Sequence, residues 1–96
     1  MIKRFIKHIQ TEKRYSMHTV SAYKRDLIQF QKYIKETYEI DNILQVDSDM
    51  VRSFLVSLKD SGLNNKSINR KSSSLRSFYA YYLREKEIDV SPISGI

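Results

Sequence analysis

Cysteine and tryptophan are absent from the 96-residue chain, which also has only two histidines, two glycines and one proline. Without cysteine, the chain can form neither a disulfide nor a thiolate metal site. The two histidines, His8 and His18, have no partner at the spacing of a metal-ligand pair. We therefore expect no metal, no cofactor and no small-molecule substrate.

Long apolar runs are also missing. No run approaches the roughly 18 residues that a membrane-spanning helix requires. The N-terminal stretch MIKRFIKHIQTEKR is interrupted by charged residues every two or three positions, so it lacks the continuous apolar segment of a secretory signal. These absences predict a cytoplasmic protein with no membrane partner.

The scarcity of glycine and proline, together with the lack of any period-two apolar alternation, predicts an all-α fold. A chain of this length can bury one core and no more. With 41% hydrophobic and 29% charged residues, its composition is that of a globular protein. The sequence therefore predicts a single four-helix domain.

Local signals place the helix ends. Ser16 is a good N-cap for a second helix, and Asp47 for a third, in which Asp49 also suits the positive end of the helix dipole. Gly62 supplies the residue of positive φ that commonly ends a helix. The predicted helices cover residues 2–13, 17–38, 48–61 and 65–86, and a short polar loop, YEIDNILQ, precedes Asp47.

Apolar residues recur at helical spacing in all four segments. The residues predicted to face the core are Ile2, Phe5, Ile6, Ile9, Val20, Tyr23, Leu27, Phe30, Ile34, Val51, Phe54, Leu55, Leu58, Ile68, Leu75, Phe78, Tyr79, Tyr82 and Leu83. Tyr81 is predicted to point outward. The tail DVSPISGI, residues 89–96, is expected to be the start of a linker, which would make the chain a fragment of a longer protein whose first domain is residues 1–88.

The formal net charge of +6 is large for so small a domain. An excess of cations favours polyanionic partners, above all nucleic acid. An acidic protein, a lipid surface, or no partner at all would also be compatible with the charge alone. The placement of the cations has to decide between these alternatives.

The fourth predicted helix carries an unusual polar face. It combines short hydroxyl side chains with cations and has no acidic residue before Glu85; its members are Lys66, Asn69, Arg70, Ser73, Ser74 and Ser77, with Lys71 and Arg76 on the flanks. Small side chains permit close approach, and Ser, Asn and Arg can hydrogen-bond phosphates or base edges. The alternative is a solvated polar face on which the serines have no function.

The second predicted helix offers a similar surface opposite its apolar stripe, formed by His18, Ser21, Ala22, Arg25, Gln29 and Lys32, with Lys24 at the edge. Ala22 could touch a thymine methyl or be a simple helix former. Thr19 could contact phosphate or help to cap the helix. His18 alone indicates little, because a solvated or capping histidine is common.

Three segments of the sequence resemble one known family. SMHTVSAYKRDLIQFQKYI is similar to the S-x-x-T-x-x-x-Y-x-x-D-L-x-x-F signature of the core-binding domain of tyrosine recombinases. KSINRKSSSLRSFYAYYL resembles the S-I-x-R-x-L-S-x-L-R-x-F-Y segment of the same domain, and VSPISGI resembles its N-P linker. The sequence departs from the pattern at Ser72, where the family usually has an apolar residue, and at Ser91, where Asn commonly precedes the proline.

The resemblance implies a four-helix SAM-like domain that grips double-stranded DNA as half of a clamp, with its second and fourth helices in the major groove. It implies DNA-facing positions at His18, Thr19, Ser21, Ala22 and Arg25, and at Lys66, Ser67, Asn69, Arg70, Lys71 and Ser74. The polar faces described above add Lys24, Ser73 and Ser77 to the predicted DNA-binding residues. Asp26 would instead pin the packing of the helices.

The resemblance also places the strand-cleaving tyrosine and its arginine, lysine and histidine partners in a following domain. This chain would then bind DNA without a catalytic residue of its own, and other recombinase protomers would join it in a synaptic tetramer. Two alternatives stay open: a stand-alone helical DNA-binding accessory protein, and a basic protein-interaction module.

Overall fold

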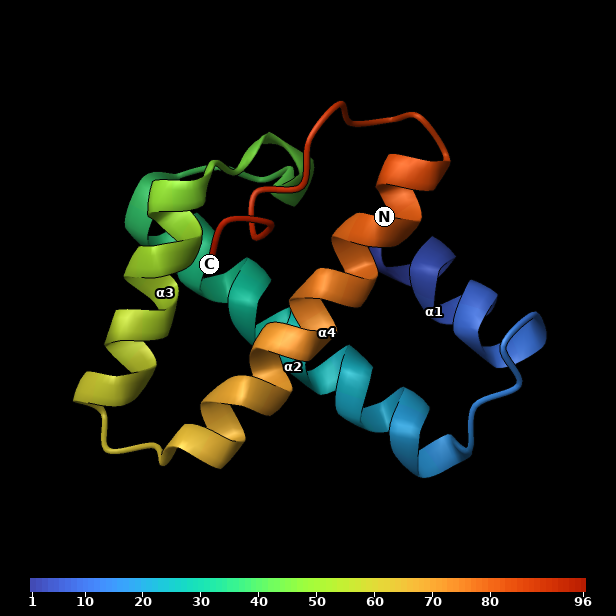
Figure 1. The fold of residues 1–96 in the computed structure, drawn as a ribbon, viewed down its shortest axis with the longest axis horizontal. Coiled ribbons are helices and arrows are strands. Elements are labelled where there is room, and N and C mark those ends of the chain that lie inside the picture. Colours follow the sequence, from blue (N-terminus) through green and yellow to red (C-terminus); the bar gives the residue numbers. More distant parts are fainter.

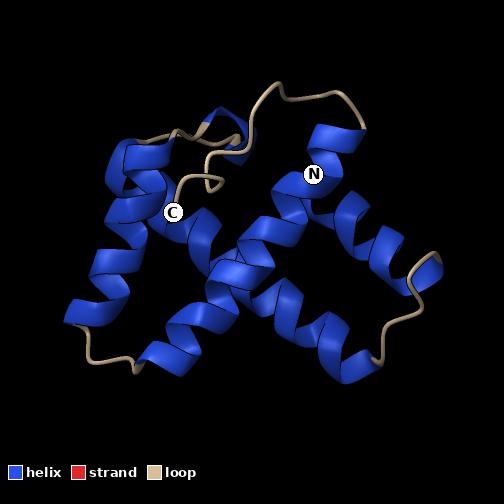
Figure 2. Ribbon diagram, in the orientation of Figure 1, coloured by secondary structure: helices blue, strands red, loops and turns tan.

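The computed structural model describes residues 1–96. Its helices are α1 (Ile2–Thr11), α2 (Met17–Tyr38), α3 (Ser48–Asp60) and α4 (Asn65–Arg84), with a one-turn 3-10 helix, η1 (Ile43–Gln45), before α3. No strand is present (Figure 2). The two long helices α2 and α4 cross near the middle of the molecule, with α1 at one end of the pair and α3 at the other (Figure 1). The predicted all-α, four-helix architecture is confirmed.

The predicted helix starts are confirmed at the level of single hydrogen bonds. Ser16 Oγ accepts from the Thr19 backbone N–H at 3.2 Å, and Asp47 Oδ1 accepts from the Met50 N–H at 2.9 Å. These caps satisfy donors that the first turn of a helix leaves without a backbone partner. Gly62, with φ of 97°, follows α3 as expected. Sequence reasoning missed the cap of α4, where the Asn64 side chain accepts from the Ser67 N–H.

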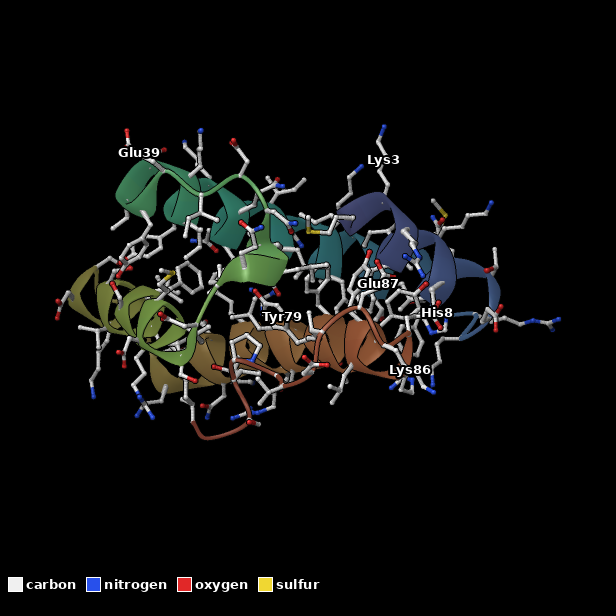
Figure 3. The ribbon with its side chains drawn as sticks, turned by 90° about the horizontal axis from the view of Figure 1, so that it is seen from above. Lys3, His8, Glu39, Tyr79, Lys86 and Glu87 are labelled. Atoms are coloured by element: carbon white, nitrogen blue, oxygen red, sulfur yellow. The ribbon has the colours of Figure 1, made fainter.

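Aromatic side chains fill the centre, where α2, α3 and α4 meet. Phe30 and Phe54 pack edge to face with ring centroids 5.0 Å apart. Tyr79 has no exposed surface, and its hydroxyl donates to the backbone carbonyl of Ile43 at 2.6 Å. Figure 3 shows Tyr79 between the helical layers, reaching toward η1. Burial raises the pKa of the Tyr79 hydroxyl, because the charged phenolate would lose its hydration.

The predicted orientation of two residues on α4 is wrong. Tyr81, expected to point outward, is only 8% exposed, and Leu83, expected in the core, is 40% exposed. The reason is that α1 packs on the flank of α4 that carries Tyr81. The Tyr81 ring lies 5.8 Å from that of Phe5 and 4.5 Å from that of His8. The core side of α4 therefore differs between its two ends.

Arg4 ties α1 to the end of α4. Its Nε donates to the Tyr81 hydroxyl at 3.2 Å, and its terminal nitrogens pair with Glu85 at 2.7 Å and with Glu87. The Tyr81 hydrogen bond, followed by the one to Glu85, raises the pKa of the Arg4 guanidinium. Figure 3 shows Glu87 on the same side of the molecule as His8 of α1.

Two segments expected to be peripheral contribute to the core. The loop before Asp47 contains Ile43, which is fully buried, and Val46, which is 6% exposed. In the tail, Ile93 is 1% exposed, and Arg76 of α4 donates to the Ile96 carbonyl at 2.6 Å. The tail runs from the end of α4 back across the bundle toward α3 (Figure 1). It has no helix, as predicted, but it packs on the domain at least as far as Ile93.

None of the helices combines the length and the apolar composition that crossing a bilayer would demand.

Candidate nucleic-acid interface

A groove lies between the N-terminal halves of α2 and α4. Both helices begin at the lower edge of Figure 1 and converge toward their crossing point. Side chains from both helices line the groove: His18, Thr19, Ala22, Tyr23 and Asp26 from α2, and Arg70, Ser73 and Ser74 from α4. The structure therefore brings together residues 44 or more positions apart in sequence, as the separation of Asp26 and Arg70 shows.

Asp26 forms the floor of this groove and is 2% exposed. Its Oδ1 accepts from Arg70 at 3.1 Å and from Lys71 Nζ at 3.0 Å, while its Oδ2 accepts from the Ser74 hydroxyl at 2.8 Å. A buried carboxylate is tolerated only when it is paired and hydrogen-bonded, and here three groups from α4 satisfy it. The expectation that Asp26 pins helix packing through a charged hydrogen bond agrees with this geometry.

Three of the predicted site residues on α4 are engaged inside the protein. Ser74 is 5% exposed, so its predicted place on the open polar face is wrong. The Lys71 side chain is 12% exposed and also donates to Gln29 Oε1 at 2.6 Å. Ser77 is half-buried, with its hydroxyl 3.3 Å from that of Tyr23. These side chains hold α4 against α2, and neither helix alone could have revealed this.

Arg70 differs from them because its side chain stays half exposed, at 50%. One terminal nitrogen is held by Asp26, and the guanidinium has further N–H donors in the same plane. Two cations, Arg70 and Lys71, face the single negative charge of Asp26. The cluster therefore keeps one positive charge in excess at the edge of the groove.

Most of the other candidate residues are exposed on α2 and α4, namely His18, Thr19, Ser21, Lys24, Arg25, Lys66, Asn69 and Ser73, while Ala22 and Ser67 are half-buried. Lys24, Arg25 and Lys66 form no ion pair within the domain. Thr19 belongs to the cap of α2, since its hydroxyl lies 3.0 Å from Ser16 Oγ. The lining of the groove thus includes the exposed His18, Thr19 and Ser73, and the same two helices carry the unpaired cations Lys24, Arg25 and Lys66.

Comparison with known proteins identifies relatives over nearly the whole chain. Residues 2–86 match the family described as phage integrase, N-terminal SAM-like domain. The tyrosine recombinase XerC of Anoxybacillus flavithermus is 41% identical over 90 residues, which cover 94% of this chain and 30% of that protein. The tyrosine recombinase XerC of Listeria innocua is 39% identical over 94 residues, covering 98% of this chain and 31% of that protein.

The tyrosine recombinase XerD of Staphylococcus haemolyticus is 42% identical over 86 residues, covering 90% of this chain and 29% of that protein. The chain therefore spans about 30% of the length of these relatives. No solved structure matches it significantly.

Proposed function

This chain belongs to the phage integrase N-terminal SAM-like domain family, and from that premise we propose that it is the DNA-gripping domain of a tyrosine recombinase. In this proposal α2 and α4 enter the major groove of one half of a recombination site with their N-terminal halves. The observation that carries the proposal is the groove between these helices, where the buried Asp26 holds Arg70 and Lys71 at the floor, together with the unpaired exposed cations of α2 and α4.

The charges of α2 and α4 suit duplex DNA. Lys24, Arg25 and Lys66 are exposed, have no acidic partner, and can release counterions from backbone phosphates on binding. Arg70 is oriented by Asp26 and still has donors for a phosphate or for the acceptor edge of guanine. An acidic protein partner would meet the same cations, but it would not require the short side chains between them.

The short side chains of α2 and α4 would allow the two helices to approach DNA closely. The major groove of B-DNA is about 12 Å wide, so it admits an α-helix. Short side chains on the inserted face let the helix backbone come closer to the bases. Ser73 on α4 and Ala22 on α2 line the groove of the protein and leave its backbone accessible. Ser21 of α2 and Asn69 of α4 are exposed and have side chains that can hydrogen-bond phosphates or base edges.

The wider role of the protein rests on its relatives. They are tyrosine recombinases, and we propose that this chain serves the same process of site-specific recombination. The nucleophilic tyrosine would then lie in another domain, since this chain aligns with only about 30% of each relative. Other protomers of the recombinase would be its partners in a synaptic tetramer.

Titration of labelled duplex DNA tests the proposal. The double variant Arg25→Ala/Lys66→Ala removes one unpaired cation each from α2 and α4, and Lys3→Ala/Lys7→Ala removes two exposed cations from α1 as a charge-matched control. We expect the first variant to lose on the order of tenfold in affinity or more at moderate salt, and the control to lose much less. Equal losses would contradict the assignment of α2 and α4, and a wild-type chain that does not bind duplex DNA would refute the function.

A further inference from the structure

A second hollow lies between α1 and the C-terminal half of α4. Its polar lining consists of His8, Lys13, Tyr15, Ser77 and Arg84. Its volume is about 140 Å³, whereas a single water needs roughly 10–15 Å³ by the same kind of measure. The hollow can therefore hold a group of several heavy atoms, such as a phosphate with its waters.

The charged residues that line this hollow are all basic. No acidic residue lines it, and neither Lys13 nor Arg84 forms an ion pair within the domain. The Nε2 atom of His8 is buried and has no hydrogen-bond partner, the single buried side-chain nitrogen or oxygen in the protein of which this is true. An unpaired buried polar atom is costly, and His8 is one of the residues that line this hollow.

The hollow continues the groove between α2 and α4. On α4, the groove is lined by Arg70, Ser73 and Ser74, and the hollow by Ser77, Ala80 and Arg84. Apart from the adjacent Ser73 and Ser74, these residues follow one another at steps of three or four positions. They therefore form one stripe along a single face of α4.

Two contacts join the groove and the hollow. The Tyr23 hydroxyl of the groove lies 3.3 Å from the Ser77 hydroxyl of the hollow. The Tyr23 ring also stacks on Tyr15, with centroids 5.9 Å apart. From Ser73 to Arg84 the stripe is about 16 Å long at about 1.5 Å per residue. That distance is within half a turn of duplex DNA, which rises about 3.4 Å per base pair.

We propose that this hollow binds a backbone phosphate of the same duplex whose major groove receives α2 and α4. The inference rests on the proposed function and extends it to a site built by α1, the loop after it and the end of α4. Lys13 and Arg84 supply the charge, and His8, Tyr15 and Ser77 complete the polar lining. The contact fixes the register of the domain along the DNA without reading sequence.

The test compares three variants with the wild-type chain in DNA titrations over a range of salt concentrations. Lys13→Ala/Arg84→Ala removes both exposed cations, and Lys3→Ala/Lys7→Ala is again the charge-matched control. If one phosphate contact is lost, the slope of log affinity against log salt becomes shallower by about 0.9, and affinity falls on the order of tenfold. Ethylation of DNA phosphates should identify one position that interferes with wild-type binding and no longer interferes with binding of the double variant.

The third variant, His8→Phe, keeps a ring against Tyr81 but removes both imidazole nitrogens from the lining of the hollow. We expect weaker DNA binding together with an unchanged or higher melting temperature, a combination that loss of a packing residue would not give. The inference is overturned if the double variant and its control bind with the same affinity and salt slope. A wild-type chain that fails to bind duplex DNA would overturn the proposed function first, and with it this inference.

Discussion

The Ser74 hydroxyl of α4 donates a hydrogen bond of 2.8 Å to Asp26 Oδ2 of α2, and both side chains are at most 5% exposed. This contact joins the two helices at the floor of the candidate DNA groove. Arg70 and Lys71 complete the coordination of the same carboxylate. The angle between the proposed DNA-binding helices therefore depends on one buried charge and its partners.

Asp26→Ala should destabilise the fold strongly. Removing one partner of a buried ion pair leaves the other charges poorly compensated, and we expect the free energy of unfolding to fall by about 3 kcal/mol, less than the largest known cases because Arg70 can turn to water. Urea denaturation measures the loss. Asp41→Ala is the control, because Asp41 pairs with Lys35 but is 83% exposed, and a change there should stay below about 0.5 kcal/mol. Equal effects of the two substitutions would argue against a buried anchor.

Ser72→Ala should stabilise the domain. Ser72 is 6% exposed, and none of the side-chain hydrogen bonds of the structure involves it. Alanine has the higher helix propensity and loses no hydrogen bond of the structure, so we expect the free energy of unfolding to rise by about 0.5 kcal/mol. DNA affinity should not change. A loss of stability in urea denaturation would show that the hydroxyl has a partner in solution.

Stability should fall above pH 10, and Tyr79 should account for much of the fall. Burial raises the pKa of the Tyr79 hydroxyl in the folded state above the ordinary value of 10.0. Its contribution to the free energy of unfolding is therefore complete below pH 10. Above pH 10 that contribution is lost, because the hydroxyl ionises in the unfolded chain and stays protonated in the folded one. One such group gives a slope of about 1.4 kcal/mol per pH unit. Tyr79→Phe should be less stable near pH 8, because the Ile43 carbonyl loses its donor, yet its decline above pH 10 should be shallower. Urea denaturation between about pH 8 and pH 11 tests this, and equal slopes would refute it.

Ile93→Ala should cost about 2–4 kcal/mol of folding free energy, since it empties a fully buried site. Val90→Ala is the matched control in the same tail, because Val90 is 69% exposed; its effect should remain within about 0.5 kcal/mol. Thermal or urea denaturation distinguishes the two. A negligible effect at Ile93 would show that the tail is detached in solution and that the domain ends near residue 88.

DNA binding by the chain should weaken steeply with salt. If the domain neutralises about five phosphates, the slope of log affinity against log salt should lie near −4 to −5, a loss of roughly several hundredfold between 50 and 200 mM. Fluorescence anisotropy with a labelled duplex measures this slope. A flat response would exclude the electrostatic mechanism, even if some binding were observed.

Much of the fold was readable from the sequence because its signals are local. Ser16 and Asp47 cap helices through a donor only three residues away, so sequence spacing suffices to predict them. The apolar stripes and the helix-ending Gly62 are local signals too, because each depends only on residues a few positions apart. The same periodicity separates a polar basic face from an apolar face on α2 and on α4, so the two helices of the candidate interface could be predicted from the sequence.

Tertiary structure decided what each face meets. A helical wheel assumes one buried side along the whole helix, but α4 packs on α2 at one end and on α1 at the other, so Tyr81 is buried and Leu83 is exposed. The same packing turned Ser74 inward to a carboxylate 48 positions away. The sequence by itself determined which segments are helical and where the cations lie, since both depend on near neighbours. Only the crossing of the helices determined which polar side chains form hydrogen bonds between helices and which remain exposed to a partner.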